Sequence, residues 1–161
     1  MTYSIDVLKL NPQLGLPKPK RGKRSERQKL ETLLDNLFSQ YVRSRAIARV
    51  GGCEKCGSQK RDIEKADGTI FPAWKQLQCS HFIGRATKQT RWHEDNGSGI
   101  CGGCHLYLEH HPAEMVEWFI KTYGQRIYDL LLASQRQPAK SVDKVGLVLY
   151  LRAKIKELVD R

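Results

Sequence analysis

Four of the five cysteines form two C-x2-C pairs, Cys53 with Cys56 and Cys101 with Cys104, and 44 residues separate the pairs. Each loop can direct two thiolates at one ion, and two such loops complete the tetrahedral coordination that zinc prefers. Two unrelated reduced pairs, or a redox motif, are the alternatives. Glycines next to or inside both pairs favour zinc knuckles: Gly51, Gly52, Gly57, Gly102 and Gly103. The sequence therefore predicts a structural Zn2+ on which folding depends.

The cysteine count also bears on the cellular compartment. With Cys79 the number is odd, and residues 1–6 lack the basic and then apolar pattern of a secretion signal. Both features argue against a disulfide framework and predict a cytoplasmic protein. No segment approaches the roughly 18 apolar residues of a membrane helix, so we expect no membrane partner.

The charge is strongly positive: 28 Lys and Arg face 17 Asp and Glu, which gives a net charge of +11. Such an excess predicts a polyanionic partner, and the absence of a basic amphipathic helix or lipidation motif favours nucleic acid over a membrane surface. Residues 1–25 lack periodicity and are expected to form a flexible basic arm. This arm is either a solvated tail or a segment lying along DNA phosphates, through Lys20, Arg21, Lys23 and Arg24.

Residues 26–161 are expected to form one domain of the α+β class, mostly helical. Ser25 and Gln28 are spaced as a capping box, before apolar residues at helical spacing over 26–49. A turn at Asp67-Gly68, a strand over 76–83 and a polar loop over 84–99 should follow. A short helix should run from the second cysteine pair to Glu109. C-terminal helices should begin at about residue 112, over 112–124, 126–134 and 142–159.

Three polar residues surround the second cysteine pair in a fixed order. His81 ends the expected strand, Asn96 follows 15 residues later, and His105 comes directly after Cys104. This order resembles the HNH, or ββα-metal, nuclease motif. The resemblance implies a zinc-bound ββα-metal core flanked by N- and C-terminal helices. It further implies a general-base histidine on a strand, an asparagine that braces the loop, and a metal ligand on a helix.

Hydrolysis of a phosphodiester explains why these residue types are needed. A neutral imidazole with a pKa near 6.5 can accept a proton from water at physiological pH, and we assign that role to His81. A divalent ion, Mg2+ or Mn2+, would neutralise charge on the phosphate. His105 is the first candidate ligand. Glu109 lies four residues later on the same helix face and is the second candidate. The alternatives are His110 as the ligand, or Glu109 as an exposed helix charge.

A narrower resemblance is to the phage NinG/Rap family of recombination endonucleases, over roughly residues 30–160. The matching segments are 79–85 (Cys-Ser-His-Phe-Ile-Gly-Arg), 91–96 (Arg-Trp-His-Glu-Asp-Asn) and 101–105. Here His105 replaces the family's usual Asn, and Ser80 stands where many HNH enzymes have Asp. The resemblance implies cleavage of branched DNA such as Holliday junctions and D-loops, in a bacterial cell or a phage-infected host. Symmetric junction cleavage needs two active sites, which implies a homodimer.

Basic residues also occupy the loop between His81 and Asn96. Arg85, Lys88 and Arg91 are candidate contacts to DNA phosphates. Trp92 either stacks on an exposed base or belongs to the core. Two other functions fit the same sequence: a non-catalytic, zinc-dependent DNA-binding module, and an HNH nuclease that acts on ordinary duplex DNA.

Overall fold

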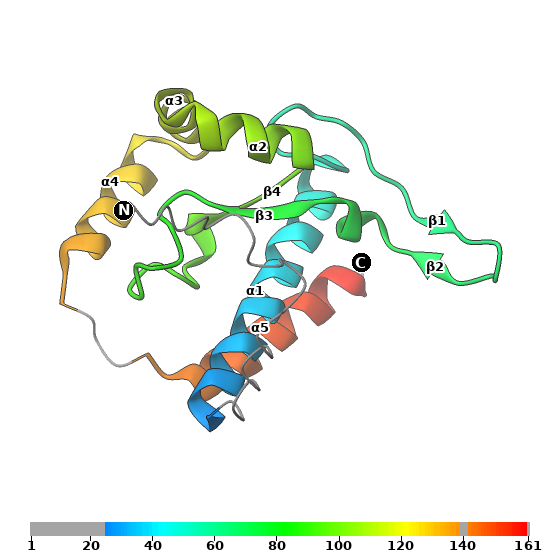
Figure 1. Cartoon of the computed structure of the whole chain (residues 1–161), viewed down its shortest axis with the longest axis horizontal. Helices are drawn as coiled ribbons and strands as arrows, with labels where there is room; N and C mark the ends of the chain where they lie inside the picture. Colours follow the sequence, from blue (N-terminus) through cyan, green and yellow to red (C-terminus); the bar gives the residue numbers. More distant parts are fainter. Residues whose placement is uncertain (1–24, 139–141, 161) are drawn as a thin grey trace, which may run out of the picture.

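The computed structural model describes residues 25–138 and 142–160. These residues form five α-helices and two small antiparallel sheets, so the predicted mixed, mostly helical architecture is confirmed (Figure 1). Among the helices of these two ranges, none combines the length and the apolar character that a membrane span requires. The basic arm, with its candidate residues Lys20, Arg21, Lys23 and Arg24, lies outside the described residues.

Helix α1 (Glu26–Val50) is the central support of the fold, and it confirms the helix predicted over 26–49. Ser25 Oγ accepts a hydrogen bond from the Gln28 amide, and Gln28 Oε1 accepts one from the Ser25 amide, which completes the capping box. The helix ends at Gly51, whose φ of 70° suits a residue without a side chain. Every fourth residue on its inner face is fully buried: Leu34, Phe38, Val42 and Ala46.

An antiparallel pair of strands, β3 (Gln78–His81) and β4 (Gly97–Ile100), lies across α1 (Figure 1). The register places His81 opposite Gly97 and Cys79 opposite Gly99. β3 is shorter than the strand predicted over 76–83, because Ala73–Gln76 form a 3-10 helix, η2, and the chain turns away after His81.

β4 corrects the end of the polar loop predicted over 84–99, whose residues 84–93 have no regular secondary structure. Its sequence, Gly-Ser-Gly-Ile, has little intrinsic strand preference, so the strand depends on its surroundings. A Cβ on Gly97 would lie 2.6 Å from Val42 Cγ2, and one on Gly99 would collide with Ala46. The glycines therefore allow β4 to approach α1 closely, and this packing produces the strand.

Three helices follow β4: α2 (Gly102–His110), α3 (Pro112–Tyr123) and α4 (Gln125–Arg136). They match the predicted helices to within one turn. Pro112 occupies the first turn of α3, where its missing N–H leaves no bond unmade. Phe119 of α3 and Leu131 of α4 bury against Ile83, so these helices cover the segment that follows β3.

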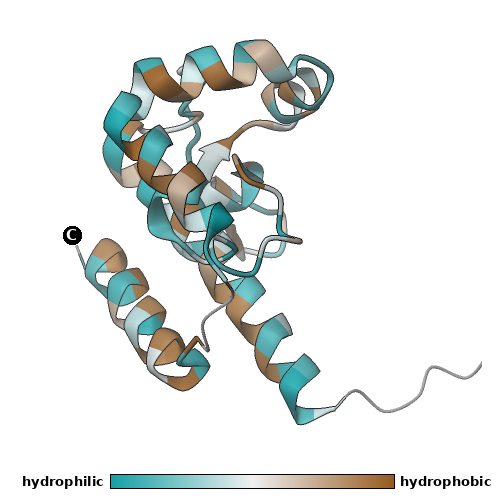
Figure 2. Ribbon diagram, turned by 90° about the vertical axis from the view of Figure 1, so that its left-hand side faces the viewer, coloured by the Kyte–Doolittle hydropathy of each residue, from teal (hydrophilic) through white to brown (hydrophobic). Residues whose placement is uncertain are grey.

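Helix α5 (Lys144–Val159) packs along α1 and begins two residues later than predicted, after Asp143 caps it by accepting from the Gly146 amide at 2.9 Å. Figure 2 shows both helices with apolar bands, and the buried residues between them include Val148 and Leu151. Lys144 Nζ also lies 2.6 Å from the Glu31 carboxylate of α1. Apolar packing and this ion pair together fix α5 to the N-terminal half of α1.

A short hairpin, β1 (Ile63–Glu64) with β2 (Ile70–Phe71), projects from the rest of the fold (Figure 1). Its turn contains the predicted Asp67-Gly68 pair. Gly68 has a φ of 76°, and Asp67 Oδ1 accepts from the Thr69 amide at 2.9 Å.

Candidate metal centre and catalytic pocket

The two cysteine pairs converge, although 44 residues separate them. Cys53 and Cys56 follow the end of α1, and Cys101 and Cys104 lie at the start of α2. All four Sγ atoms lie within 4.8 Å of one another, and those of Cys56 and Cys101 are 3.9 Å apart. Tetrahedral zinc with Zn–S bonds of about 2.3 Å requires sulfurs about 3.8 Å apart. The predicted four-cysteine cluster is confirmed, with a geometry that suits zinc.

The four thiols influence one another's protonation. Burial raises the pKa of Cys53, but hydrogen bonds from the backbone N–H groups of Cys56, Cys101 and Lys55 outweigh it and lower the pKa to about 7. Burial and the neighbouring sulfurs raise the pKa of Cys104 far above its usual value. Neighbouring thiolates repel one another, and a divalent metal bound by all four sulfurs would neutralise their charge and release the remaining protons.

Glu54 joins the first cysteine pair to the rest of the fold. Its side chain is only 3% exposed, and Oε2 accepts from the Gly99 amide of β4 at 2.7 Å and from the Tyr123 hydroxyl of α3 at 3.2 Å. Arg49 pairs with its other oxygen at 3.2 Å. Sequence reasoning missed this role, for which the signal is an acid between two ligands in a basic chain.

A cavity of about 290 Å³ lies between β3, α2 and α1. Three of the predicted catalytic and metal-binding residues line it together: His81, His105 and Glu109. Arg85, a predicted phosphate contact, and Asp35 of α1 also line it. The structure thus gathers into one pocket residues that the sequence spreads over three separate segments.

His81 has a defined tautomer at this pocket. Its Nε2 lies 3.0 Å from the carbonyl oxygen of Arg91, and a carbonyl can only accept, so Nε2 carries the proton. The Nδ1 atom of the neutral ring therefore retains its lone pair. Burial lowers the pKa of His81, and the positive charge of Arg85 adds to this effect. His81 is accordingly neutral at physiological pH, as a general base must be.

His105 has the complementary arrangement. Its Nδ1 lies 2.5 Å from Gln78 Oε1, which places the ring proton on Nδ1 and leaves the lone pair on Nε2. That Nε2 lies 3.6 Å from Glu109 Oε1. The exposed His110, the alternative ligand, does not line the cavity. The geometry therefore favours Glu109 as the partner of His105.

The four-cysteine cluster and the His105–Glu109 pair offer different numbers of metal ligands. In the described ranges, the four cysteines are the only group of three or more potential metal ligands that converge. His105 and Glu109 offer one nitrogen and one carboxylate. A pair of this kind fits Mg2+ or Mn2+, which take few protein ligands and complete their coordination with water and substrate phosphate.

Asn96 holds the loop between β3 and β4. It is fully buried, its Oδ1 accepts from the Ile83 amide at 2.7 Å, and its Nδ2 donates to the carbonyls of Ile83 and Thr90, both at 2.9 Å. The side chain lies outside the cavity lining. Its contacts are those of the loop brace expected from the sequence.

The candidate phosphate contacts divide into two groups. Arg85 and Lys88 are exposed, and Arg85 lies at the cavity. Arg91 differs from them, because its guanidinium forms two hydrogen bonds with Asp35, at 2.9 and 2.5 Å, and its contact with phosphate stays a prediction. Trp92 is buried in the core, so the core interpretation holds for this residue.

Two residues at the pocket were not predicted from the sequence: Asp35, which lines the cavity, and Gln78, which orients His105. Asp35 lies beside the apolar stripe of α1, and an acid at that position could have marked it as a candidate functional residue. No feature of the sequence marks Gln78 in this way. Comparison of the chain with protein-family models, with curated proteins and with solved structures found no match. Inferences about function therefore rest on the motifs and on this pocket.

Proposed function

We propose that the chain is a metal-dependent DNA endonuclease of the HNH type. The observation that carries the proposal is the single cavity in which His81, with a free Nδ1, lies together with the His105–Glu109 pair. A zinc-dependent DNA-binding module would need the four cysteines and the positive charge. It would have no use for two imidazoles held in opposite tautomers at one pocket.

The order of elements supports an HNH-type core. β3 carries His81 at its end, Asn96 immediately precedes β4, and α2 carries His105 in its first turn. Strand, strand and helix thus follow one another with the three motif residues at the junctions. Cys101 is the N-cap of α2 and Cys104 lies in its first turn, so the four-cysteine cluster holds the start of this helix. His105 directly follows Cys104 and is therefore held close to the cluster.

The proposed chemistry assigns one task to each residue. Nδ1 of His81 accepts the proton of the attacking water while Nε2 stays bonded to the Arg91 carbonyl, which prevents rotation of the ring. Arg85 offers positive charge to the scissile phosphate. His105 Nε2 and the Glu109 carboxylate would hold the ion. A bound Mg2+ or Mn2+ supplies charge stabilisation at the phosphate and at the departing 3′ oxygen.

For the substrate we propose branched recombination intermediates, such as Holliday junctions and D-loops. The net charge of +11 supports nucleic acid as the partner, and the resemblance to the NinG/Rap family supports the branched form. Symmetric cleavage of a four-way junction would need two copies of the pocket, so we propose a homodimer. Matched four-way junction, fork and linear duplex substrates would separate this activity from cleavage of ordinary duplex DNA.

The decisive experiment is nicking of supercoiled plasmid DNA by zinc-loaded protein with Mg2+ or Mn2+. His81→Ala should lower the rate by about 100-fold or more, as expected for loss of a general base, while zinc content and DNA binding stay intact. His93→Ala is the matched control, because His93 lies in the loop that follows β3, outside the cavity lining, and its side chain caps a short 3-10 helix, η3 (Glu94–Asn96). DNA binding without any cleavage by the wild type would favour the non-catalytic module.

A second comparison tests the ligand assignment. Glu109→Ala should raise the metal concentration needed for cleavage, and excess Mn2+ should relieve part of the loss. His110→Ala, one residue further along α2, should leave the metal requirement unchanged. The reverse result would assign the second ligand to His110.

A further inference from the structure

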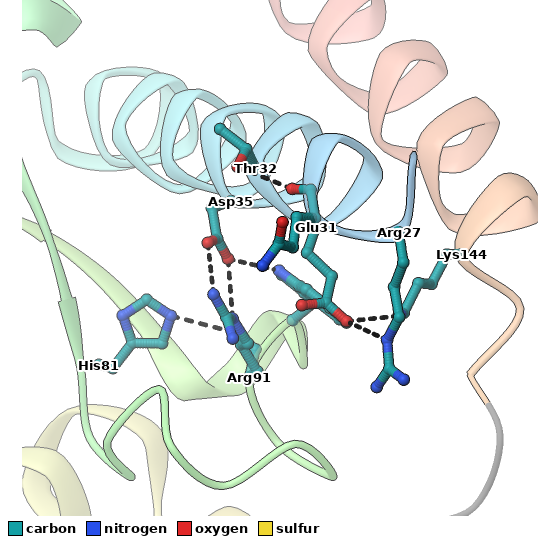
Figure 3. A network of polar contacts seen from close by, with 9 residues as sticks. Arg27, Glu31, Thr32, Asp35, His81, Arg91 and Lys144 are labelled. Atoms are coloured by element: carbon teal, nitrogen blue, oxygen red, sulfur yellow. Dashed lines mark hydrogen bonds and ion pairs between the residues drawn. The ribbon is translucent and has the colours of Figure 1, made fainter. Parts of the chain in front are cut away.

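Asp35 of α1 lines the same cavity as His81, yet it is not available as a free carboxylate. Arg91 Nε donates to Oδ1 at 2.9 Å, and Arg91 Nη2 donates to Oδ2 at 2.5 Å (Figure 3). The Trp92 indole N–H also donates to Oδ1, at 2.9 Å. Three donors from two adjacent residues thus converge on one side chain. Such a bidentate pairing fixes orientation as well as position.

The main chain of Arg91 makes a second connection. Its carbonyl oxygen accepts the hydrogen bond from His81 Nε2 at 3.0 Å (Figure 3). The residue that α1 holds through its side chain therefore holds the imidazole through its backbone. The result is a continuous series of contacts from Asp35 through Arg91 to His81.

We propose that Asp35 is a positioning residue, which holds the Arg91 carbonyl where it orients the His81 imidazole toward the pocket. The proposal rests on the proposed nuclease function for its catalytic consequence, but the orientation of His81 can be measured without cleavage. It assigns to α1, an element outside the strand–strand–helix unit, a role in arranging the catalytic base through Arg91.

The loop that carries Arg91 depends on such an external anchor. Between β3 and η3 it has no regular secondary structure. Asn96 fixes it at Ile83 and Thr90. The next two residues, Arg91 and Trp92, are held at their side chains by Asp35. Asn96 and Asp35 thus secure consecutive stretches of one loop from different elements.

α1 is a rigid support for this purpose. Leu34, next to Asp35, is fully buried in the core shared with α5. One turn earlier, Glu31 pairs with Lys144 of α5 at 2.6 Å and with Arg27 at 3.3 Å (Figure 3). The Asp35–Arg91 pair itself is shielded, since each side chain is only 23% exposed, so solvent screens it less than a surface ion pair.

The first test separates kcat from KM in plasmid nicking with Mn2+. Asp35→Ala should lower kcat by about 10- to 100-fold, the cost of a displaced catalytic group. KM should stay the same or fall, because the change removes a negative charge from the cavity that we propose binds DNA. Asp35→Asn, which keeps one acceptor oxygen and the side-chain volume, should fall between the wild type and Asp35→Ala, and it covers the case in which Asp35→Ala does not fold.

Glu31→Gln is the matched control, because Glu31 lies one turn away on α1 and pairs with cations, but it does not line the cavity. It should lower the melting temperature and leave kcat unchanged. Equal losses of kcat in Glu31→Gln and Asp35→Asn would overturn the proposal, because general loosening of α1 would then explain both.

A double variant tests whether the contacts act in series. Asp35→Ala combined with Arg91→Ala should lose no more kcat than the more damaged single variant, since both changes release the same carbonyl. Losses that multiply would mean that the two residues act independently, and they would contradict the proposal.

The last readout does not need nuclease activity. In protein with 15N-labelled histidine, the Nε2–H of His81 should exchange slowly with solvent in the wild type and faster in Asp35→Asn. Faster exchange with an inactive wild type would retain the positioning role and reject the nuclease. Cleavage by the wild type with unchanged exchange and unchanged kcat in Asp35→Asn would retain the nuclease and reject the positioning role.

Discussion

Nδ1 of His105 lies 2.5 Å from Oε1 of Gln78, and this bond joins the first turn of α2 to the first residue of β3. It fixes the imidazole proton on Nδ1 and leaves the Nε2 lone pair facing Glu109. His105 directly follows Cys104, so the four-cysteine cluster holds the adjacent backbone while Gln78 orients the ring. The structural metal site and the proposed catalytic site are therefore neighbouring parts of one arrangement.

Removing the side-chain amide of Gln78 should lower the affinity of the proposed catalytic site for its metal ion. In Gln78→Leu the His105 ring loses its orienting acceptor, and such partners typically change metal affinity by about 10- to 100-fold. We expect the Mn2+ concentration for half-maximal cleavage to rise by that factor. Gln76→Leu is the control, because Gln76 bonds only to the Arg61 carbonyl, outside the pocket. An unchanged Mn2+ requirement in Gln78→Leu would contradict the role given to this residue.

Loss of one zinc ligand should unfold the central region. Structural zinc contributes on the order of 10 kcal/mol, about the net stability of a whole domain, so Cys104→Ser should lower the melting temperature sharply and abolish cleavage. Cys79→Ser is the matched control, since Cys79 lies outside the cluster and burial raises the pKa of its thiol to about 12. Elemental analysis should find one zinc per chain in the wild type and in Cys79→Ser. Folded, active protein without zinc would refute the structural site.

The pH dependence of cleavage should reflect His81. Burial lowers its pKa below the usual value of about 6.5, so the neutral, active form persists to lower pH than for an exposed histidine. The rate should therefore rise with pH and reach half its plateau below about pH 6.5. Because the pKa of His81 is lower in the folded chain than in the unfolded chain, the unfolded chain binds the imidazole proton more readily. Protonation of His81 should therefore lower the free energy of unfolding as the pH falls below about 6.5. A midpoint above 6.5 would contradict a buried, neutral base.

The parts of this structure that sequence could predict are those set by local spacing. Two C-x2-C loops, and the four-residue separation of His105 and Glu109, constrain geometry wherever they occur. The sequence did not predict β4, because this glycine-rich segment forms a strand where it packs on Val42 and Ala46 of α1, which are remote in sequence. The pairing of Arg91 with Asp35 could not be predicted for the same reason, since Asp35 precedes Arg91 by 56 residues. Nothing local distinguishes a paired arginine from one that is free to bind phosphate.

Deletion of residues 1–24 tests the basic arm and leaves the Ser25 cap of α1 in place. If Lys20, Arg21, Lys23 and Arg24 lie along phosphates, the deletion should weaken binding to junction, fork and linear DNA by similar factors. Each lost contact should flatten the slope of log K against log salt by about 0.9, so the loss of all four would reduce it by about 3.6. The rate at saturating DNA should not change, because the arm takes no part in the chemistry. Replacing the four residues with glutamine should reproduce the effect, which would show that charge matters and length does not. An unchanged salt slope in both variants would identify the arm as a solvated tail.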